Sequence, residues 1–331
     1  MIKIDLVTGF LGSGKTTFIR NYAKYLISQG KRIAILENDY GAINVDMMML
    51  EDLEGDQCDL QMVVGGSDYD CHKRRLKSKL ITLGMLGYDR VIMEPSGIFD
   101  VDEFTDTLRE EPLDRWYEIG SVISIVDASL KEELSEESEY LIVSQTANAA
   151  AVILSRTQEV EADRIRLTID HINRAFEKFR CSRNLSAGDL IMDKPWDQYG
   201  TEEYEAILRA GFVHADHIKI PVTDDNAYDS MFYMNVKMRE EEIRPTLTRL
   251  LADSACGEII RIKGYVSCPE EKCWIEINAT ASEMRIEPST QGQEVIIVIG
   301  EHLDRDKIAE YFDFSYGSGH EFIHQDEGSL Q

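Results

Sequence analysis

Short apolar runs alternate with helical patterns through the first half of the chain. Each run has the length of a buried strand, and each following segment places apolar residues three or four positions apart, as an amphipathic helix does. Strands that alternate with helices form mostly parallel sheets, so the pattern predicts an α/β domain. The predicted strands are 2–7, 32–36, 60–64, 88–93, 119–126 and 150–154, and the predicted helices are 18–27, 73–86, 100–116, 132–144 and 161–179.

The pattern weakens between residues 184 and 225, where prolines and glycines interrupt it. A second set of elements follows, with predicted strands at 231–238, 259–263, 274–278 and 295–299 and predicted helices at 239–251 and 304–312. We therefore predict an α/β domain over residues 1–185, a connector over 186–230 and a smaller α+β domain over 231–331.

A glycine-rich segment joins the first predicted strand to the first predicted helix. Its residues are Gly9, Phe10, Leu11, Gly12, Ser13, Gly14, Lys15, Thr16 and Thr17. They fit the phosphate-binding loop, in which glycines let backbone N–H groups approach phosphate oxygens and the helix N-terminus adds positive charge. Lys15 is predicted to act on the β- and γ-phosphates as the catalytic cation, and Thr16 to ligate Mg²⁺. The alternative, a turn that binds nothing, is disfavoured because both the strand and the helix are in place.

Acidic residues follow two other predicted strands. Glu94-Pro95-Ser96-Gly97 ends one of them, and such a carboxylate holds Mg²⁺ while the glycine amide senses the γ-phosphate. An acidic loop from Glu37 to Asp46 follows another strand, at the sheet edge where α/β proteins bind ligands. Glu37 and Asp46 are further candidates for Mg²⁺ or water, and a solvated loop is an equal alternative.

The composition and charge of the chain favour a globular protein and argue against several kinds of partner. The 331 residues are 43% hydrophobic and 29% charged, as in ordinary globular proteins of about two domains. The net charge of −26 argues against a nucleic-acid or anionic-membrane partner. No apolar run approaches the ~18 residues of a membrane span, and Met1 leads directly into the first strand without room for a signal peptide. We expect a cytoplasmic protein whose cysteines are reduced.

Taken together, these motifs resemble the CobW-type GTPases, relatives of the HypB and UreG nickel-insertion GTPases. The resemblance covers nearly the whole chain, in the family's order. It rests on the phosphate loop, on residues 37–41, on Glu94–Gly97, on Val126-Asp127-Ala128, on Ile260–Gly264 and on Ile299–Asp304. It implies a GTP-driven metallochaperone that uses Mg²⁺ with GTP (or ATP) and assists a metallo- or corrinoid enzyme.

The chain departs from the family after the third predicted strand. The family has Gly-Cys-x-Cys-Cys there, a soft-metal site, whereas Ser67, Tyr69 and Asp70 stand at the cysteine positions here. Cys71 and His72 lie just beyond and make a much weaker candidate for a transition metal. The favoured alternative is a helix start capped by an aspartate.

A second departure concerns the base. The family has Asn-Lys-x-Asp, whose aspartate accepts hydrogen bonds from guanine, and this chain has Ser155, Arg156, Thr157 and Gln158 instead. The resemblance implies that Ser155, Arg156 and Gln158 contact the nucleotide. Gln158 is neutral and cannot make the same pair of charge-assisted bonds, so we expect weaker discrimination between GTP and ATP.

Two other functions are compatible with a phosphate loop. A small-molecule kinase would need a substrate pocket with a general base, and the sequence shows no such constellation. A nucleotide-gated binding module would bind nucleotide with little turnover.

Overall fold

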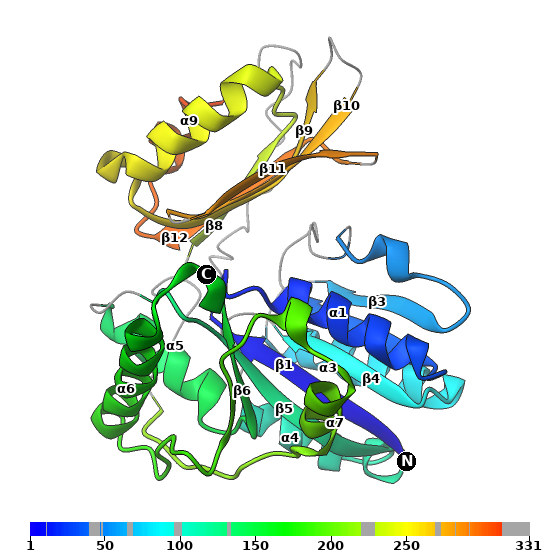
Figure 1. The fold of residues 1–331 in the computed structure, drawn as a ribbon. Helices are drawn as coiled ribbons and strands as arrows, with labels where there is room; N and C mark the ends of the chain where they lie inside the picture. The colour runs from blue at the N-terminus through cyan, green and yellow to red at the C-terminus, as the bar shows by residue number, and fades with distance from the viewer. Residues whose placement is uncertain are drawn as a thin grey trace, which may run out of the picture. The chain divides into compact units, whose positions relative to one another are not determined.

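A computed structural model describes residues 1–10, 12–39, 47, 49–64, 69–95, 101–130, 134–219, 229–268, 273–281, 283–290 and 292–312. The chain divides into two compact units, Met1–Thr223 and Asp224–Gln331. Each unit is built around its own sheet (Figure 1).

The first unit contains a seven-stranded sheet in the order β3-β2-β4-β1-β5-β6-β7. All of its neighbouring strands pair in parallel, which confirms the predicted α/β class. All strands of a parallel sheet have their carboxyl-terminal ends on the same side, so the loops that follow the strands lie together there. We call this side the nucleotide edge. The strands are β1 (Ile2–Gly9), β2 (Ile33–Asp39), β3 (Cys58–Val64), β4 (Arg90–Pro95), β5 (Tyr117–Asp127), β6 (Ala151–Ser155) and β7 (Leu190–Met192).

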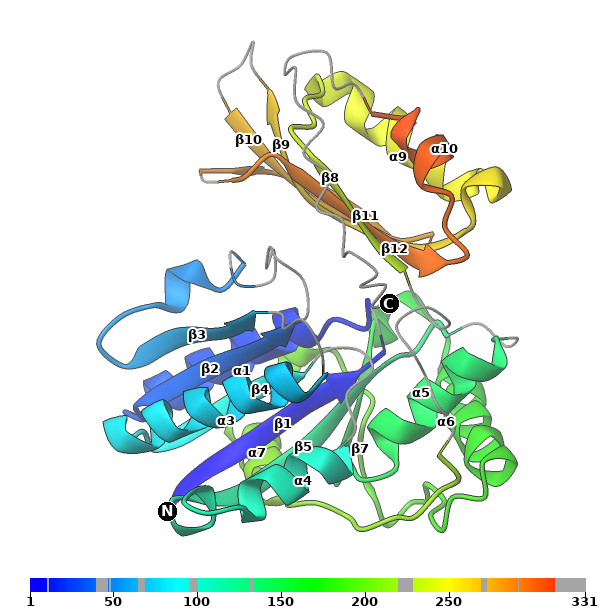
Figure 2. The same cartoon turned by 180° about the vertical axis from the view of Figure 1, so that it is seen from behind.

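Helices cover both faces of this sheet, as parallel sheets require. Helices α1 and α7 lie on one face (Figure 1), and α3 and α4 lie on the other (Figure 2). Phe18, Tyr22 and Leu26 of α1 are four residues apart and fully or almost fully buried, so they form the stripe that holds α1 on the sheet. The helices are α1 (Lys15–Ser28), α3 (Tyr69–Leu86), α4 (Val101–Arg109), α5 (Glu136–Thr146), α6 (Ala162–Lys178) and α7 (Thr201–Arg209).

A buried polar cluster lies inside the first unit, around Asp5 of β1. The Asp5 carboxylate is 0% exposed and forms an ion pair with Arg90. It accepts hydrogen bonds from the Tyr22 hydroxyl at 2.8 Å and from the Ser121 N–H at 2.7 Å. Burial, and next the charge of Asp5, raise the pKa of Tyr22 well above its ordinary value, so the hydroxyl keeps its proton. The cluster joins β1, β4, β5 and α1.

Two segments differ from the sequence-based expectation. Strand β7 and helix α7 lie within the span predicted as a connector, and both belong to the first unit. Three residues of β7 are too few to show a period, so its pairing with β6 is invisible in the sequence. Strand β2 continues through Asp39, although the sequence predicts a loop from Glu37, because β3 and β4 both pair with its last residues.

The second unit contains a five-stranded antiparallel sheet in the order β11-β10-β9-β12-β8. Helices α9 (Glu240–Ala252) and α10 (Arg305–Ala309) cover one face of it, as Figure 2 shows. This confirms the predicted α+β fold. No helix in the described ranges is long and apolar enough to cross a membrane. The strands are β8 (Asp229–Met234), β9 (Glu258–Cys268), β10 (Cys273–Ala279), β11 (Met284–Ser289) and β12 (Val295–Glu301).

Candidate nucleotide-binding site

The phosphate loop joins the central strand β1 to helix α1. Gly9 ends β1 with φ 143°, and a Cβ there would lie 2.2 Å from the carbonyl oxygen of Ile125 on β5. Gly14 caps α1 with φ 96° and ψ 20°, a left-handed conformation that favours glycine. Only glycine therefore lets the loop lie this close to β5 and turn directly into the helix. The first-turn N–H groups of α1 face the edge where the strands end.

Lys15 lies buried beside this loop. Its Nζ donates a hydrogen bond to the carbonyl oxygen of Gly9 at 3.0 Å and lies 3.7 Å from Oε1 of Glu94. Lys15 is 8% exposed and Glu94 is 6% exposed. Burying a cation is costly unless an opposite charge lies close by. The carboxylate at the end of β4 thus holds the ammonium group at the phosphate loop.

Oxygen donors suitable for Mg²⁺ lie next to this pair. Glu37 of β2 is the direct neighbour of Glu94 in the β2–β4 register, and Glu37 is also buried. Thr16 is buried in the first turn of α1. Carboxylate and hydroxyl oxygens are the hard ligands that Mg²⁺ prefers, so this donor set fits the ion. The other predicted candidates for the site, Leu11, Asp46 and Gly97, lie outside the described residues.

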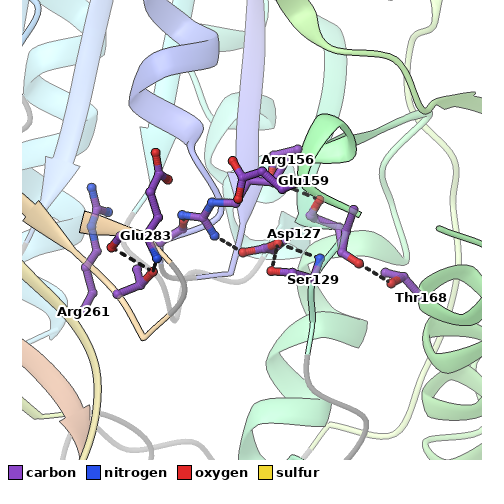
Figure 3. A network of polar contacts seen from close by, with 12 residues as sticks. Asp127, Ser129, Arg156, Glu159, Thr168, Arg261 and Glu283 are labelled. Carbon is purple, nitrogen blue, oxygen red and sulfur yellow. Dashed lines mark hydrogen bonds and ion pairs between the residues drawn. The ribbon is translucent and has the colours of Figure 1, made fainter. Parts of the chain in front are cut away.

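An arginine links the predicted base-binding segment to the phosphate loop. Arg156 follows β6 with φ 55° and forms an ion pair with Asp127 at the end of β5 (Figure 3). Its Nη2 also donates to the carbonyl oxygen of Gly12 at 3.2 Å. Asp127 in turn accepts hydrogen bonds from the N–H of Ser129 at 2.8 Å and from its hydroxyl at 2.6 Å. One guanidinium group therefore joins β5, β6 and the phosphate loop.

The other two predicted base-binding residues, Ser155 and Gln158, differ in how deeply they are buried. Ser155 is buried at the end of β6. Gln158 is exposed, and its amide donates to the carboxylate of Glu159 at 3.2 Å. The Asp127–Arg156 pair was not predicted from the sequence, because the two residues lie at the ends of different strands.

We expect Arg156→Ala to weaken the binding of Mg-GDP about ten-fold or more and to lower the free energy of unfolding by about 1–3 kcal/mol. The variant removes a charge-assisted bond to the loop and leaves the partly buried Asp127 without its cation. Calorimetric titration and denaturant unfolding measure the two effects. Arg166→Ala is the matched control, since Arg166 makes only an exposed pair with Asp163 on one helix. Unchanged nucleotide affinity in Arg156→Ala would contradict this role.

The transition-metal candidate lies only partly within the described residues. Cys71 lies in the first turn of α3, which begins at Tyr69, and its side chain is partly buried. The side chain of His72 lies outside the described part of the structure. Over the residues that the structure describes, no group of three or more histidine, cysteine or acidic side chains is arranged to hold a metal ion.

The sequence-based prediction missed one aromatic residue at this edge. Trp196 opens the short 3₁₀ helix η4 (Trp196–Gln198), which follows β7. A Cβ on Gly14 would lie 2.9 Å from Cη2 of its indole. The residue was missed because it lies in the predicted connector and belongs to no motif.

Comparisons with known proteins agree with the motifs. Residues 3–184 match the family model described as CobW/HypB/UreG, nucleotide-binding domain, and residues 236–314 match the cobalamin synthesis protein cobW C-terminal domain. The zinc chaperone YjiA of Escherichia coli K12 is 29% identical over 182 residues, which are 52% of this chain and 55% of that protein. The zinc-regulated GTPase metalloprotein activator 1 of Schizosaccharomyces pombe is 24% identical over 182 residues, 52% of this chain and 44% of its own.

These matches are partial in length. The chain spans about half the length of the curated relatives it matches. The crystal structure of Zn(II)-bound YjiA GTPase from E. coli aligns with 94% of this chain and 97% of its own, at 19% identity and a TM-score of 0.35. A score this low adds nothing to the fold that the strand order already establishes.

Proposed function

The chain belongs to the CobW/HypB/UreG family of nucleotide-binding proteins, and on that premise we propose that it binds and hydrolyses GTP to assist the insertion of a metal or corrinoid cofactor into a client enzyme. The observation that carries the proposal is the buried Lys15–Glu94 pair beside a phosphate loop at the centre of a parallel sheet. Two relatives are described as a zinc chaperone and as a GTPase metalloprotein activator, which supports this class of role. We place the protein in the cytoplasm, where free thiols such as Cys58 and Cys181 stay reduced.

In this proposal the protein supplies charge and position. The loop N–H groups and the α1 N-terminus bind phosphate oxygens, and Lys15 neutralises the charge that develops during transfer. Thr16 and Glu94, with Glu37 beside them, would hold Mg²⁺, which when bound offsets phosphate charge. Arg156 keeps the loop in shape through the Gly12 carbonyl.

Nucleotide state would reach a partner through the segment after β2. Glu37 lies at the nucleotide edge, and the chain from Glu37 to Asp46 begins there. Loss of the γ-phosphate and its contacts releases such segments in other nucleotide switches. We propose that the chain beyond the end of β2 at Asp39, as far as Asp46, reorganises on hydrolysis, and that the Gly97 amide senses the γ-phosphate.

Phosphate release separates this function from its two rivals. We expect the purified chain to release phosphate from Mg-GTP without any added acceptor, faster when a metal or a client enzyme is present. A small-molecule kinase would release little phosphate until its acceptor was supplied. A gated binding module would bind nucleotide and show no turnover above the buffer rate under any of these conditions.

Base selectivity gives a sharper prediction. We expect GTP and ATP to bind within about a hundred-fold of each other, because the neutral Gln158 loses one charge-assisted bond to guanine, worth about 1.5–3 kcal/mol. Its amide can instead donate to adenine N1. Gln158→Asp should widen the gap in favour of GTP. Titrations with both nucleotides at one magnesium concentration measure the two affinities.

Gln57→Asp serves as the charge-matched control, since Gln57 is exposed just before β3, away from the edge where the strands end. A wild type that prefers GTP by many thousand-fold would show that other residues read the base and that Gln158 does not set the selectivity.

Zinc affinity tests the departure from the family's cysteine motif. We expect no sub-nanomolar zinc or cobalt site at residues 67–72, because three thiolates are replaced there. Any residual binding should be weaker and should depend on Cys71 and His72. Competition with a strong chelator measures it, with Cys181→Ala as the control for another partly buried free thiol. Stoichiometric metal that survives the chelator and is lost in Cys71→Ala, but not in Cys181→Ala, would overturn this expectation.

A further inference from the structure

The indole of Trp196 lies against the phosphate loop of the candidate site. Strand β7 pairs in parallel with β6. The segment that follows β7 therefore starts at the carboxyl-terminal ends of the strands, on the same side as the phosphate loop. The Cβ position of Gly14 is 2.9 Å from Cη2 of Trp196 and 4.0 Å from the Cβ of Ser155. The ring therefore packs against the last glycine of the phosphate loop, and the same Cβ position lies in van der Waals range of the first residue of the base-binding segment.

Other aromatic rings support this indole from one side. The Phe18 ring lies 6.2 Å from the Trp196 ring and is tilted by 45°. Phe18 stacks on Tyr22 at 5.6 Å, and Tyr22 stacks on Tyr204 of α7 at 6.1 Å. Phe18 and Tyr22 are fully buried, whereas Trp196 is only partly buried. These rings therefore connect the buried face of α1 to an indole beside the phosphate loop that is still partly accessible.

We propose that Trp196 forms one wall of the nucleoside end of the site and contacts the base of the bound nucleotide. The inference rests on the proposed nucleotide binding and adds a residue to it. A flat heteroaromatic base is the ligand class that an indole recognises through its face. Stacking of this kind tolerates any base, because every base has a π-face. It would therefore supply affinity for the nucleoside without the selectivity that a family-type aspartate at position 158 would provide.

A comparison of GDP with inorganic pyrophosphate tests this role. We expect Trp196→Ala to weaken Mg-GDP binding about five- to a hundred-fold and to leave Mg-pyrophosphate affinity within about two-fold, because pyrophosphate has no base. Trp196→Phe should keep most of the GDP affinity. Equal losses for GDP and pyrophosphate would mean that the ring only supports the phosphate loop, and the proposal would be overturned.

Fluorescence provides a second readout that does not depend on the alanine variant folding. GDP should change the tryptophan emission of the wild type, and Trp196→Phe should abolish that change. Trp274→Phe, in the second unit, should preserve it and is the matched control. If the wild type binds GDP and the signal persists in Trp196→Phe, the base contact is refuted while the proposed function stands. If the wild type binds neither GDP nor pyrophosphate, the proposed function fails as well.

Discussion

Lys15→Ala should abolish detectable binding or hydrolysis of Mg-nucleotide while the chain remains folded. Lys15 is the buried cation of the phosphate loop, held by the Gly9 carbonyl and by Glu94. Removing one charge-assisted phosphate contact costs about 1.5–3 kcal/mol or more, and the same charge is needed when the transferred phosphate carries its greatest negative charge. Alanine leaves the buried Glu94 carboxylate without this counter-ion, so the free energy of unfolding should fall, but the apolar core is untouched and the chain should still fold. Calorimetric titration and phosphate release measure the two losses, and circular dichroism checks the fold.

Lys24→Ala is the matched control for this change. Lys24 lies on the same helix, and its side chain is 51% exposed in a loose pair with Asp52. It should bind and hydrolyse nucleotide like the wild type. Equal affinity of Lys15→Ala and wild type for Mg-nucleotide would refute the assignment of the phosphate site.

Asp5→Ala should strongly destabilise the first unit, with a loss of about 3–5 kcal/mol in the free energy of unfolding. The substitution leaves the guanidinium of Arg90, whose side chain is only 11% exposed, without this counter-ion. It also removes the acceptor of the Tyr22 hydroxyl and of the Ser121 N–H. A buried donor that loses its acceptor keeps its full desolvation cost. Urea unfolding, followed by circular dichroism, measures the change.

Asp52→Ala isolates the effect of burial. Asp52 pairs with Arg20 at 2.7 Å, but both side chains are over 40% exposed. Exposed pairs contribute about 0–1 kcal/mol, so this variant should unfold nearly as the wild type does. If Asp5→Ala and Asp52→Ala lower the free energy of unfolding by similar amounts, the buried Asp5 cluster does not contribute more to stability than an exposed ion pair does.

The parts of the fold that could be predicted from the sequence are those whose signal lies within one short segment of the chain. Strands β1, β4, β5 and β6 are largely buried on both faces, so β4 and β6 contain continuous apolar runs and β1 and β5 are mainly apolar with a few polar residues. The family resemblance was confirmed, because its motifs are short and keep fixed spacing. Strand β11 was missed because none of its residues is fully buried and it contains a proline, so it has no sustained apolar pattern.

The missed features of the site depend on contacts between distant segments. Arg156 meets Asp127 only because β5 and β6 are neighbours in register. Trp196 meets Gly14 only because β7 extends the sheet beyond β6. No hydrophobic period and no sequence motif indicates either contact. Both depend on the order of the strands in the sheet, which a single sequence does not reveal. Likewise, Glu37 was predicted in a loop because the neighbours that extend β2 as a strand come later in the chain.

The central position of β1 also determines when the site can form during synthesis. Both hydrogen-bonded neighbours of β1 come later in the chain, β4 at Arg90–Pro95 and β5 at Tyr117–Asp127. A ribosome that has released only the first 89 residues has therefore exposed an apolar strand with both edges open, the kind of segment that pairs with other chains. The phosphate loop, although it is encoded almost first, reaches its final shape only after β5 has emerged. The segment that carries the phosphate-binding motif is therefore made well before the strands that complete it, and β1 is without its sheet partners over that interval.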